Sequence, residues 1–208
     1  MNSDYYQLHA QRFFSETVDV DMSELYRPFV AHLKPGARIL DAGCGSGRDA
    51  KAFSEMGYEV EAFDASAELV ELARQHTGLP VKQMRFEDIT EVERYDGIWC
   101  CASLLHVPLA ELPGVMAQLA KALKPGGVWY LSFKYGSGER EKDGRRFTDM
   151  DESGLEEMIG GLSGIEVMEC WITGDRRHEK KSETWINMVI ARKKSHSLLS
   201  KKILLWST

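Results

Sequence analysis

The feature of this sequence that most constrains its fold is a regular alternation of short apolar runs with stretches of helical periodicity. The apolar runs predict strands at residues 38–41, 59–64, 80–86, 95–102 and 128–133. The stretches between them predict helices at residues 46–56, 67–76 and about 108–123. Strands joined through helices run parallel with right-handed crossovers, so the pattern predicts an open, doubly wound sheet with helices on both faces.

The last part of the chain breaks this alternation. A predicted helix at residues 151–160 is followed by two strands, at 165–173 and 184–192, with no helix between them. Such strands form a hairpin, which places an antiparallel strand at or near one edge of the sheet. The predicted fold class is therefore α/β, a three-layer sandwich with a mostly parallel sheet whose last strand is antiparallel.

Segments at both ends lie outside the predicted sheet. We interpret residues 1–33 as a helical lid, 34–192 as the main domain, and 193–208 as a basic tail. The tail contains lysines and apolar residues but no acid, which fits a frayed terminus better than a membrane-touching segment. A length of 208 residues suits one such domain.

Composition excludes several classes of function. The formal net charge of −6 provides no global basic field, so we expect no nucleic-acid partner. We find neither a signal peptide nor an apolar run of about 18 residues, which predicts a cytoplasmic protein without a membrane partner. The four cysteines include the neighbours Cys100 and Cys101, whose side chains point to opposite faces of a strand, and we predict no bound metal and no disulfide framework.

A glycine-rich turn, Asp41–Gly47, follows the first predicted strand. In an open parallel sheet ligands bind beyond the carboxyl ends of the strands, and glycines let the backbone approach a ligand closely. The dinucleotide pattern needs a glycine at the position of Arg48, whereas here the third glycine comes one residue early, at Gly47. Asp41 would also repel a pyrophosphate. It would attract a cationic ligand, such as the ammonium and sulfonium groups of S-adenosylmethionine.

The next strand ends carry groups that suit the rest of such a ligand. Asp64, which ends the second strand, can accept hydrogen bonds from two ribose hydroxyls. After the third strand, Asp88 can accept from an adenine amine and Ile89 can pack on its ring. The fourth strand ends at Cys101 and Ser103, near the expected sulfonium.

At these motifs the sequence resembles the class I S-adenosylmethionine-dependent methyltransferases. The resemblance rests on the segments 39–47, 63–66, 86–88, 95–98 and 123–127. It implies a seven-stranded sheet, with Asp41, Gly43 and Gly45 around the methionine end of the ligand and Asp64 on its ribose. Within that class the chain looks like the small-molecule branch that includes tellurite-resistance-type and ubiquinone-biosynthesis-type enzymes.

From these motifs we predict the ligand-contacting residues. Those that bind S-adenosylmethionine are Asp41, Gly43, Cys44, Gly45, Gly47, Asp64, Ala65, Glu87, Asp88, Ile89, Cys101 and Ser103. Those that bind the acceptor are Tyr5, Tyr135, Arg145, Arg146, Arg176 and Arg177. Candidate catalytic residues are His106, Lys134 and Tyr6.

Each acceptor-side prediction has a structural alternative. His106 would act as a base or orient the acceptor, or it would simply pack near adenosine at a helix start. The N-terminal tyrosines would close over the ligand, or their helix would only pack on the domain. The cations of two loops predict an anionic or polar acceptor, such as a carboxylate, or they form a solvated face with Glu139, Glu141, Asp143 and Glu179.

The function predicted is methyl transfer from S-adenosylmethionine to a small acceptor by in-line displacement, in a monomer or homodimer. A methyltransferase acting on a macromolecule is one alternative, although residues 102–105 lack an Asn-Pro-Pro-Tyr type motif. A nicotinamide-dependent oxidoreductase and a binding module that keeps the ligand without catalysis are two others.

Overall fold

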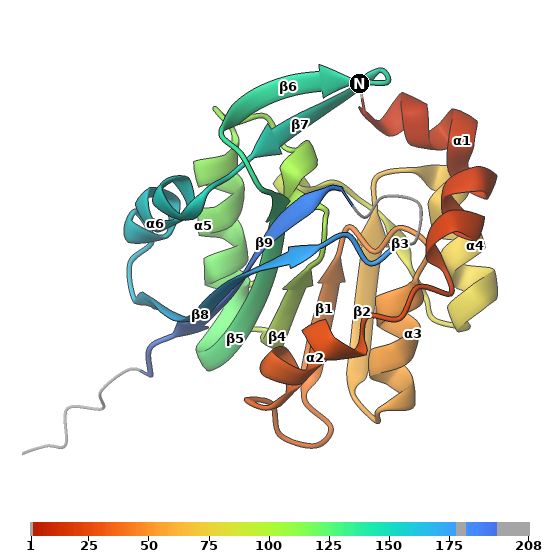
Figure 1. Ribbon diagram of the computed structural model, residues 1–208. Helices are drawn as coiled ribbons and strands as arrows, with labels where there is room; N and C mark the ends of the chain where they lie inside the picture. The colour runs from red at the N-terminus through yellow and green to blue at the C-terminus, as the bar shows by residue number, and fades with distance from the viewer. Residues whose placement is uncertain (1, 178–181, 195–208) are drawn as a thin grey trace, which may run out of the picture.

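The structure is a computed structural model that describes residues 2–177 and 182–194. These residues form a seven-stranded sheet in the order β3-β2-β1-β4-β5-β9-β8 and a separate two-stranded hairpin (Figure 1). The strands of the large sheet are β1 (Arg38–Ala42), β2 (Glu59–Asp64), β3 (Lys82–Gln83), β4 (Tyr95–Cys100), β5 (Leu123–Lys134), β8 (Ile165–Gly174) and β9 (Thr184–Arg192). The hairpin consists of β6 (Gly138–Lys142) and β7 (Arg145–Asp149). Most of the predicted basic tail, and Glu179, lie outside the described residues.

Helices cover both faces of the large sheet, giving three layers (Figure 1). The α-helices are α1 (Asn2–Thr17), α2 (Ser23–Val30), α3 (Arg48–Glu55), α4 (Ala67–Thr77), α5 (Leu112–Ala122) and α6 (Glu152–Gly160). Short 3₁₀ helices follow β3 and β4, namely η1 (Phe86–Asp88) and η2 (Leu104–His106). None of the helices in the described ranges is long and apolar enough to cross a bilayer.

The sheet confirms the predicted fold class. Strands β3, β2, β1, β4 and β5 are parallel, and β9 pairs antiparallel with both β5 and β8. The last strand therefore lies between two others, one position in from the edge. Because β5 and β8 run the same way, the loops that follow them meet at one end of the sheet.

Three predicted boundaries were wrong. The third strand, predicted over 80–86, consists only of Lys82–Gln83, because the chain turns into η1. The helix predicted from Pro108 starts at Leu112, after a turn, and β5 begins at Leu123 rather than at Val128. The hairpin β6–β7 was predicted as a loop, because its charged residues show none of the alternation that marks a half-buried strand.

Predicted helix ends agree well with the structure. Ser66 caps α4 by accepting a hydrogen bond from the Leu69 N–H, and Gly78 ends it in the left-handed conformation. Gly47 precedes α3 at a φ of 77°, and a Cβ atom there would lie 2.7 Å from Thr77 Cγ2. The third glycine of the turn is therefore required for close packing of α3 on α4.

The two faces of the sheet bury separate apolar clusters. On one face α2 and α3 pack on Trp99 and Tyr130, whose rings stack with centroids 3.8 Å apart. Phe29 of α2 is fully buried there, with ring centroids 5.2 Å from Trp99 and 5.6 Å from Phe53. On the other face α5 and α6 bury Leu119 and Leu155 against the alternate side chains of the same strands.

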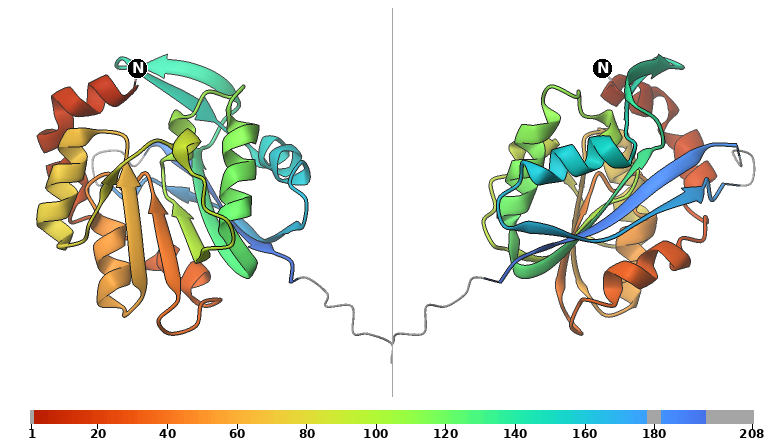
Figure 2. Two further views of the ribbon diagram at one scale, coloured as in Figure 1. Left: turned by 180° about the vertical axis from the view of Figure 1, so that it is seen from behind. Right: turned by 60° about the vertical axis from the view of Figure 1, so that its left-hand side comes forward.

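Helix α1 and the hairpin β6–β7 lie at the end of the sheet where the parallel strands finish (Figures 1 and 2). Helix α1 packs on α4 and also contacts β7. These two segments cover the loops that carry the predicted site. Helix α2 is instead part of the core, so of the segment predicted as a lid only α1 lies over the strand ends.

We expect Phe29→Ala to lower the free energy of unfolding by about 3–5 kcal/mol, because it leaves a cavity between α2 and the sheet. Urea unfolding followed by circular dichroism measures the change. Val92→Ala is the matched control, because Val92 is 68% exposed and its loss should change stability by less than about 0.5 kcal/mol. Equal effects of the two substitutions would contradict the packing of α2 described above.

Candidate functional site

The glycine-rich turn after β1 is packed so closely that side chains cannot replace two of its glycines. Gly43 has a φ of 76°, and a Cβ atom there would lie 2.6 Å from Ser103 Cβ. Gly45 has a φ of 55°, and its Cβ atom would meet Phe13 of α1 at 3.0 Å. The turn therefore presents bare backbone to the space between α1 and the end of β4.

Asp41 lies behind this turn and is 2% exposed. Its Oδ2 atom has no hydrogen-bond partner among the described residues. Burial and the nearby carboxylate of Asp49 raise the pKa of Asp41, while Arg48 opposes the rise. The Asp41 side chain lies directly behind the turn and lines neither of the two cavities described below.

Asp64 ends β2 beside the turn. Its carboxylate accepts hydrogen bonds from the N–H groups of Gly45 and Ser66, both at 2.9 Å. Burial raises the pKa of Asp64, and these backbone N–H groups counteract the rise. The side chain is therefore held in a fixed position at the cleft described next.

Two neighbouring cavities lie at the strand ends. The large cleft, of about 640 Å³, extends from the turn over Asp64, Phe86 and Ser103. The small cavity, of about 160 Å³, lies between the turn, α1, the hairpin and the ends of β5, β8 and β9. The two cavities share six of their lining residues, and these mark the junction between them: Tyr6, Phe13, Gly43, Gly45, Ala102 and His106.

Ala102 at this junction has a strained backbone. Its φ is 52°, a conformation that non-glycine residues adopt rarely. Its N–H donates to Ser132 Oγ at 2.9 Å, which holds the end of β4 in this shape. Strain of this kind is often found at functional sites.

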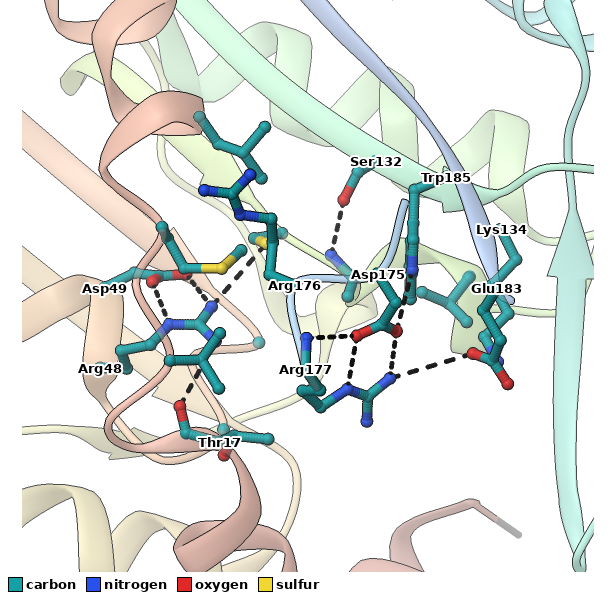
Figure 3. A pocket seen from close by; sticks show the side chains of 18 of the residues that line it. Thr17, Arg48, Asp49, Ser132, Lys134, Asp175, Arg176, Arg177, Glu183 and Trp185 are labelled. Atoms are coloured by element: carbon teal, nitrogen blue, oxygen red, sulfur yellow. Dashed lines mark hydrogen bonds and ion pairs between the residues drawn. The ribbon is translucent and has the colours of Figure 1, made fainter. Parts of the chain in front are cut away.

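The small cavity is rich in cations that have acidic partners (Figure 3). Arg177 forms an ion pair with Asp175 at 2.6 Å, and Lys134 forms one with Glu183 at 2.6 Å. Arg176, which is also drawn there, forms an ion pair with Glu24 of α2 at 2.7 Å. The predicted convergence of the two loops is therefore seen, but much of their positive charge is neutralised within the protein.

A buried network below the turn joins three elements. Asp49 accepts hydrogen bonds from the Tyr26 hydroxyl at 2.6 Å and from Trp99 Nε1 at 2.8 Å. Its ion pair with Arg48, at 2.6 Å, places the guanidinium at the wall of the small cavity (Figure 3). The arginine lowers the pKa of Asp49 against the opposing effect of burial.

Tyr6 and His106 form a hydrogen bond across the junction, with 2.8 Å between Tyr6 Oη and His106 Nε2. His106 Nδ1 lies 3.2 Å from the carbonyl oxygen of Arg146, which can only accept, so Nδ1 carries the proton. The Tyr6 hydroxyl then donates to Nε2. Burial, assisted by the charges of Arg145 and Lys134, lowers the pKa of His106 to about 4, so the imidazole is neutral at pH 7.

The structure brings most of the predicted residues to the two cavities. Those that line the large cleft are Tyr6, Gly43, Gly45, Asp64, Ala65, Glu87, Ser103, His106 and Arg146. Those that line the small cavity are Tyr6, Gly43, Cys44, Gly45, Cys101, His106, Lys134, Arg145, Arg176 and Arg177. Neither cavity is lined by Tyr5, Asp41, Gly47, Asp88, Ile89 or Tyr135.

The residues outside the cavities have visible structural roles. Asp88 accepts a hydrogen bond from the Arg85 N–H, and Ile89 is 2% exposed in the core. Tyr135 is 42% exposed and donates to Glu152. Ligand contacts by these residues stay predictions.

Sequence reasoning missed several residues of the site. Arg48 was considered only as the missing glycine of a dinucleotide pattern, and Asp49 was not considered. A charged pair directly after a glycine-rich turn is a usable signal, because its first helical turn lies beside the ligand. No signal marked Ala102, whose role is entirely conformational.

Part of this chain is similar to known methyltransferases. Residues 39–127 match a family of methyltransferase domains. The chain is 36% identical over 105 residues to the ubiquinone biosynthesis O-methyltransferase of Xanthomonas campestris pv. campestris strain B100. That alignment covers 47% of this chain and 43% of the relative, so the chain matches less than half the length of that curated protein.

Solved structures share the fold over most of the chain. The 1,6-didemethyltoxoflavin-N1-methyltransferase of Burkholderia thailandensis, with bound S-adenosylhomocysteine, has a TM-score of 0.74 at 22% identity. The alignment covers 93% of this chain and 87% of that one. A magnesium protoporphyrin IX methyltransferase of Synechocystis has a TM-score of 0.71 at 18% identity, covering 92% and 95% of the two chains.

A cyclase named SpnF also has this fold, with a TM-score of 0.69 at 17% identity over 93% of this chain and 95% of its own. Identities this low carry the fold alone. The activity must therefore be argued from the residues at the junction.

We expect Asp41→Asn to stabilise the protein at pH 7 by about 1 kcal/mol, or roughly 2–4 °C in Tm. In the folded protein the pKa of Asp41 is raised above its ordinary value of 3.8, which applies in the unfolded chain. Stability is therefore lost as the pH rises from 3.8 through the raised pKa. The gain should vanish near pH 3, where Asp41 is protonated in both the folded and the unfolded protein. Thermal unfolding across this pH range measures it.

Asp49→Asn is the contrasting variant, because it leaves Arg48 buried without its counter-ion. We expect a loss of about 3–5 kcal/mol. A loss of stability in Asp41→Asn at pH 7 would contradict the electrostatics proposed for the turn.

Proposed function

We propose that this chain, whose residues 39–127 match a family of methyltransferase domains, is a class I S-adenosylmethionine-dependent methyltransferase that transfers a methyl group to a small-molecule acceptor. S-Adenosylmethionine would bind in the large cleft, with its methionine end at the turn. The acceptor would bind in the small cavity. The observation that carries the proposal is the junction, where two cavities of unlike lining meet at Tyr6, Ala102 and His106.

The residues of the large cleft fit this ligand. Gly43 and Gly45 line the cleft with backbone alone, and the Ser103 Oγ atom is buried without a hydrogen-bond partner in the described chain. Asp64 would accept hydrogen bonds from the ribose hydroxyls. Asp41, Asp49 and Asp64 together would favour the positive charge of the methionine end over a pyrophosphate.

When bound, S-adenosylmethionine supplies an electrophilic methyl group on a positively charged sulfur. The protein's task is then mainly to hold the acceptor in line and to exclude water, which can contribute about 7–11 kcal/mol to lowering a barrier. Tyr6 and Phe13 of α1 line both cavities and so provide part of this enclosure. A closing motion of α1, the part of the predicted lid that lies over the strand ends, belongs to the same proposal.

A base is needed only for an acceptor that keeps its proton near neutral pH. His106 could accept a proton only by way of Tyr6, whose hydroxyl occupies its Nε2 lone pair, and its pKa of about 4 makes it a weak base at neutral pH. Lys134 is less suited to this role. Burial lowers the pKa of Lys134, but Glu183 at 2.6 Å favours its charged form.

Two other functions are distinguished by the same site. A nicotinamide-dependent oxidoreductase is disfavoured by the carboxylates around the turn and by Arg48 in place of a third-position glycine. A module that keeps the ligand without methyl transfer is the other alternative, because a fold shared with a cyclase does not specify the reaction. Turnover of radiolabelled methyl groups against a panel of small acceptors separates such a module from a methyltransferase.

We expect Asp64→Asn to weaken binding of S-adenosylhomocysteine by about tenfold to a hundredfold, because a neutral amide replaces the acceptor of two ribose hydrogen bonds. Isothermal titration calorimetry measures the dissociation constant. Glu59→Gln, at the opposite end of β2 and with a 65% exposed side chain, is the control and should bind as the wild type does. Unchanged affinity in Asp64→Asn would remove the support for this cleft as the donor site.

S-Adenosylhomocysteine at a hundred times its dissociation constant should raise Tm by roughly 5–10 °C, since ligand binding adds about 2.7 kcal/mol to stability. NADH at the same concentration should not. A larger shift with NADH would instead support the oxidoreductase.

A further inference from the structure

One cation of the small cavity differs from the others. Arg145 begins β7, and its side chain is 14% exposed. Its guanidinium carbon lies 4.4 Å from the ring centroid of Tyr5, 5.2 Å from that of Phe147 and 6.0 Å from that of Tyr6. The buried Nε atom makes no hydrogen bond within residues 2–177 and 182–194, and the guanidinium also interacts with the Tyr6 hydroxyl, where it opposes the rise that burial causes in the pKa of Tyr6.

Arg145 also has the weakest counter-ion among the cations compared here. Arg176, Arg177 and Lys134 have carboxylate oxygens at 2.6–2.7 Å. The carboxylate near Arg145 belongs to Asp143, at 3.8 Å, and is 64% exposed. A pair at that distance and exposure is largely screened by water, so the positive charge of Arg145 is poorly compensated.

The other cations near Phe147 are paired. Lys134 Nζ lies 4.7 Å from its ring centroid and the Arg140 guanidinium 4.9 Å from it, but Lys134 pairs with Glu183 and Arg140 with Asp149. Among the described residues, Arg145 is therefore the cation beside this ring that lacks a close counter-ion. Neutral His106 is a further neighbour, with ring centroids 5.2 Å apart. Burial lowers the pKa of His106, and the charges of Arg145 and Lys134 lower it further.

We propose that Arg145 binds the carboxylate of an aromatic acid and so selects the acceptor. The inference rests on the proposed function and specifies its substrate class. The unpartnered Nε atom supplies one arm of a two-pronged contact with a carboxylate. Glu183 and Asp175 of the same cavity would repel a dianion, so a monoanion is favoured over a phosphate.

The ring of such an acid would contact the aromatic side chains at the junction. Tyr6, Phe13 and Phe147 line the small cavity and present ring surface next to Arg145. Aromatic contacts of this kind favour a planar ring over an aliphatic chain. The carboxylate thus fixes one end of the acceptor, and the rings orient the rest toward the junction.

The experiment measures binding of benzoate to the protein saturated with S-adenosylhomocysteine, by NMR titration. We expect Arg145→Gln to weaken benzoate binding at least about tenfold. Arg140→Gln is the control, since it removes an equal charge from the same hairpin at a residue that lines neither cavity, and it should change the affinity by less than about twofold. Equal affinity of wild type and Arg145→Gln for benzoate would overturn the proposal.

Two further probes test the two halves of the proposal. Benzamide has the same shape without the charge and should bind much more weakly than benzoate. Acetate has the charge without the ring and should also bind more weakly. Benzamide binding as tightly as benzoate would overturn the role of the anion, and acetate binding as tightly would overturn that of the ring.

The His106 ring signal provides a readout that does not depend on affinity. Benzoate should raise the pKa of His106 from about 4, because its charge offsets the cations that lower it. Arg145→Gln alone should also raise the pKa of His106. An unchanged pKa in both cases would mean that the anion does not bind beside Arg145.

Failure of the proposed function has a different signature. If S-adenosylhomocysteine does not bind, its own titration shows no saturation, and the benzoate series is measured on the protein alone. Circular dichroism confirms that Arg145→Gln is folded, and Arg145→Lys provides a second variant that keeps the charge but not the planar fork. Arg145→Lys should bind benzoate more weakly than the wild type but still in preference to benzamide and acetate. An affinity for benzoate equal to that of the wild type would contradict the two-pronged contact.

Discussion

The arrangement of the site depends on the hydrogen bonds and the ion pair of one buried carboxylate, that of Asp49. It accepts from Tyr26 of α2 and Trp99 of β4 while forming the ion pair that positions Arg48. One buried group therefore fixes how the N-terminal helices, the first helix after the turn and the central strand lie relative to one another. A buried charge is costly unless its hydrogen bonds are complete, and here the three partners supply them.

The turn above this carboxylate has little freedom of its own. Gly43 is pressed against Ser103, Gly45 against Phe13 and Gly47 against Thr77. The glycines are thus needed for contacts with three different elements as well as for exposure of the backbone. The strained residue Ala102 follows β4. The turn and the end of β4 therefore hold each other in position.

The sheet and the glycine-rich turn could be predicted because local rules dictate them: apolar runs, helix caps such as Ser66, and glycines at positive φ. The third strand was predicted too long because Pro80–Phe86 is apolar enough for a strand, whereas pairing with β2 involves only two of its residues. The hairpin β6–β7 was missed because its strands are held by long-range neighbours such as Val107, whose carbonyl accepts from Thr148. Pairings such as Tyr6 with His106 join residues far apart in the sequence, and no local pattern encodes them.

The position of β9 has a consequence for how the chain is made. Within the described residues β8 pairs in the sheet only with β9, and β9 separates it from β5. A ribosome releases residues 165–174 before residues 184–192, so β8 emerges with no neighbour to pair with. This half of the sheet must therefore close late, by insertion of β9 between β5 and β8, and such non-local pairing slows folding. A nascent chain that stops short of Thr184 would expose both the long flank of β5 and an unpaired β8, which are surfaces prone to association with other chains.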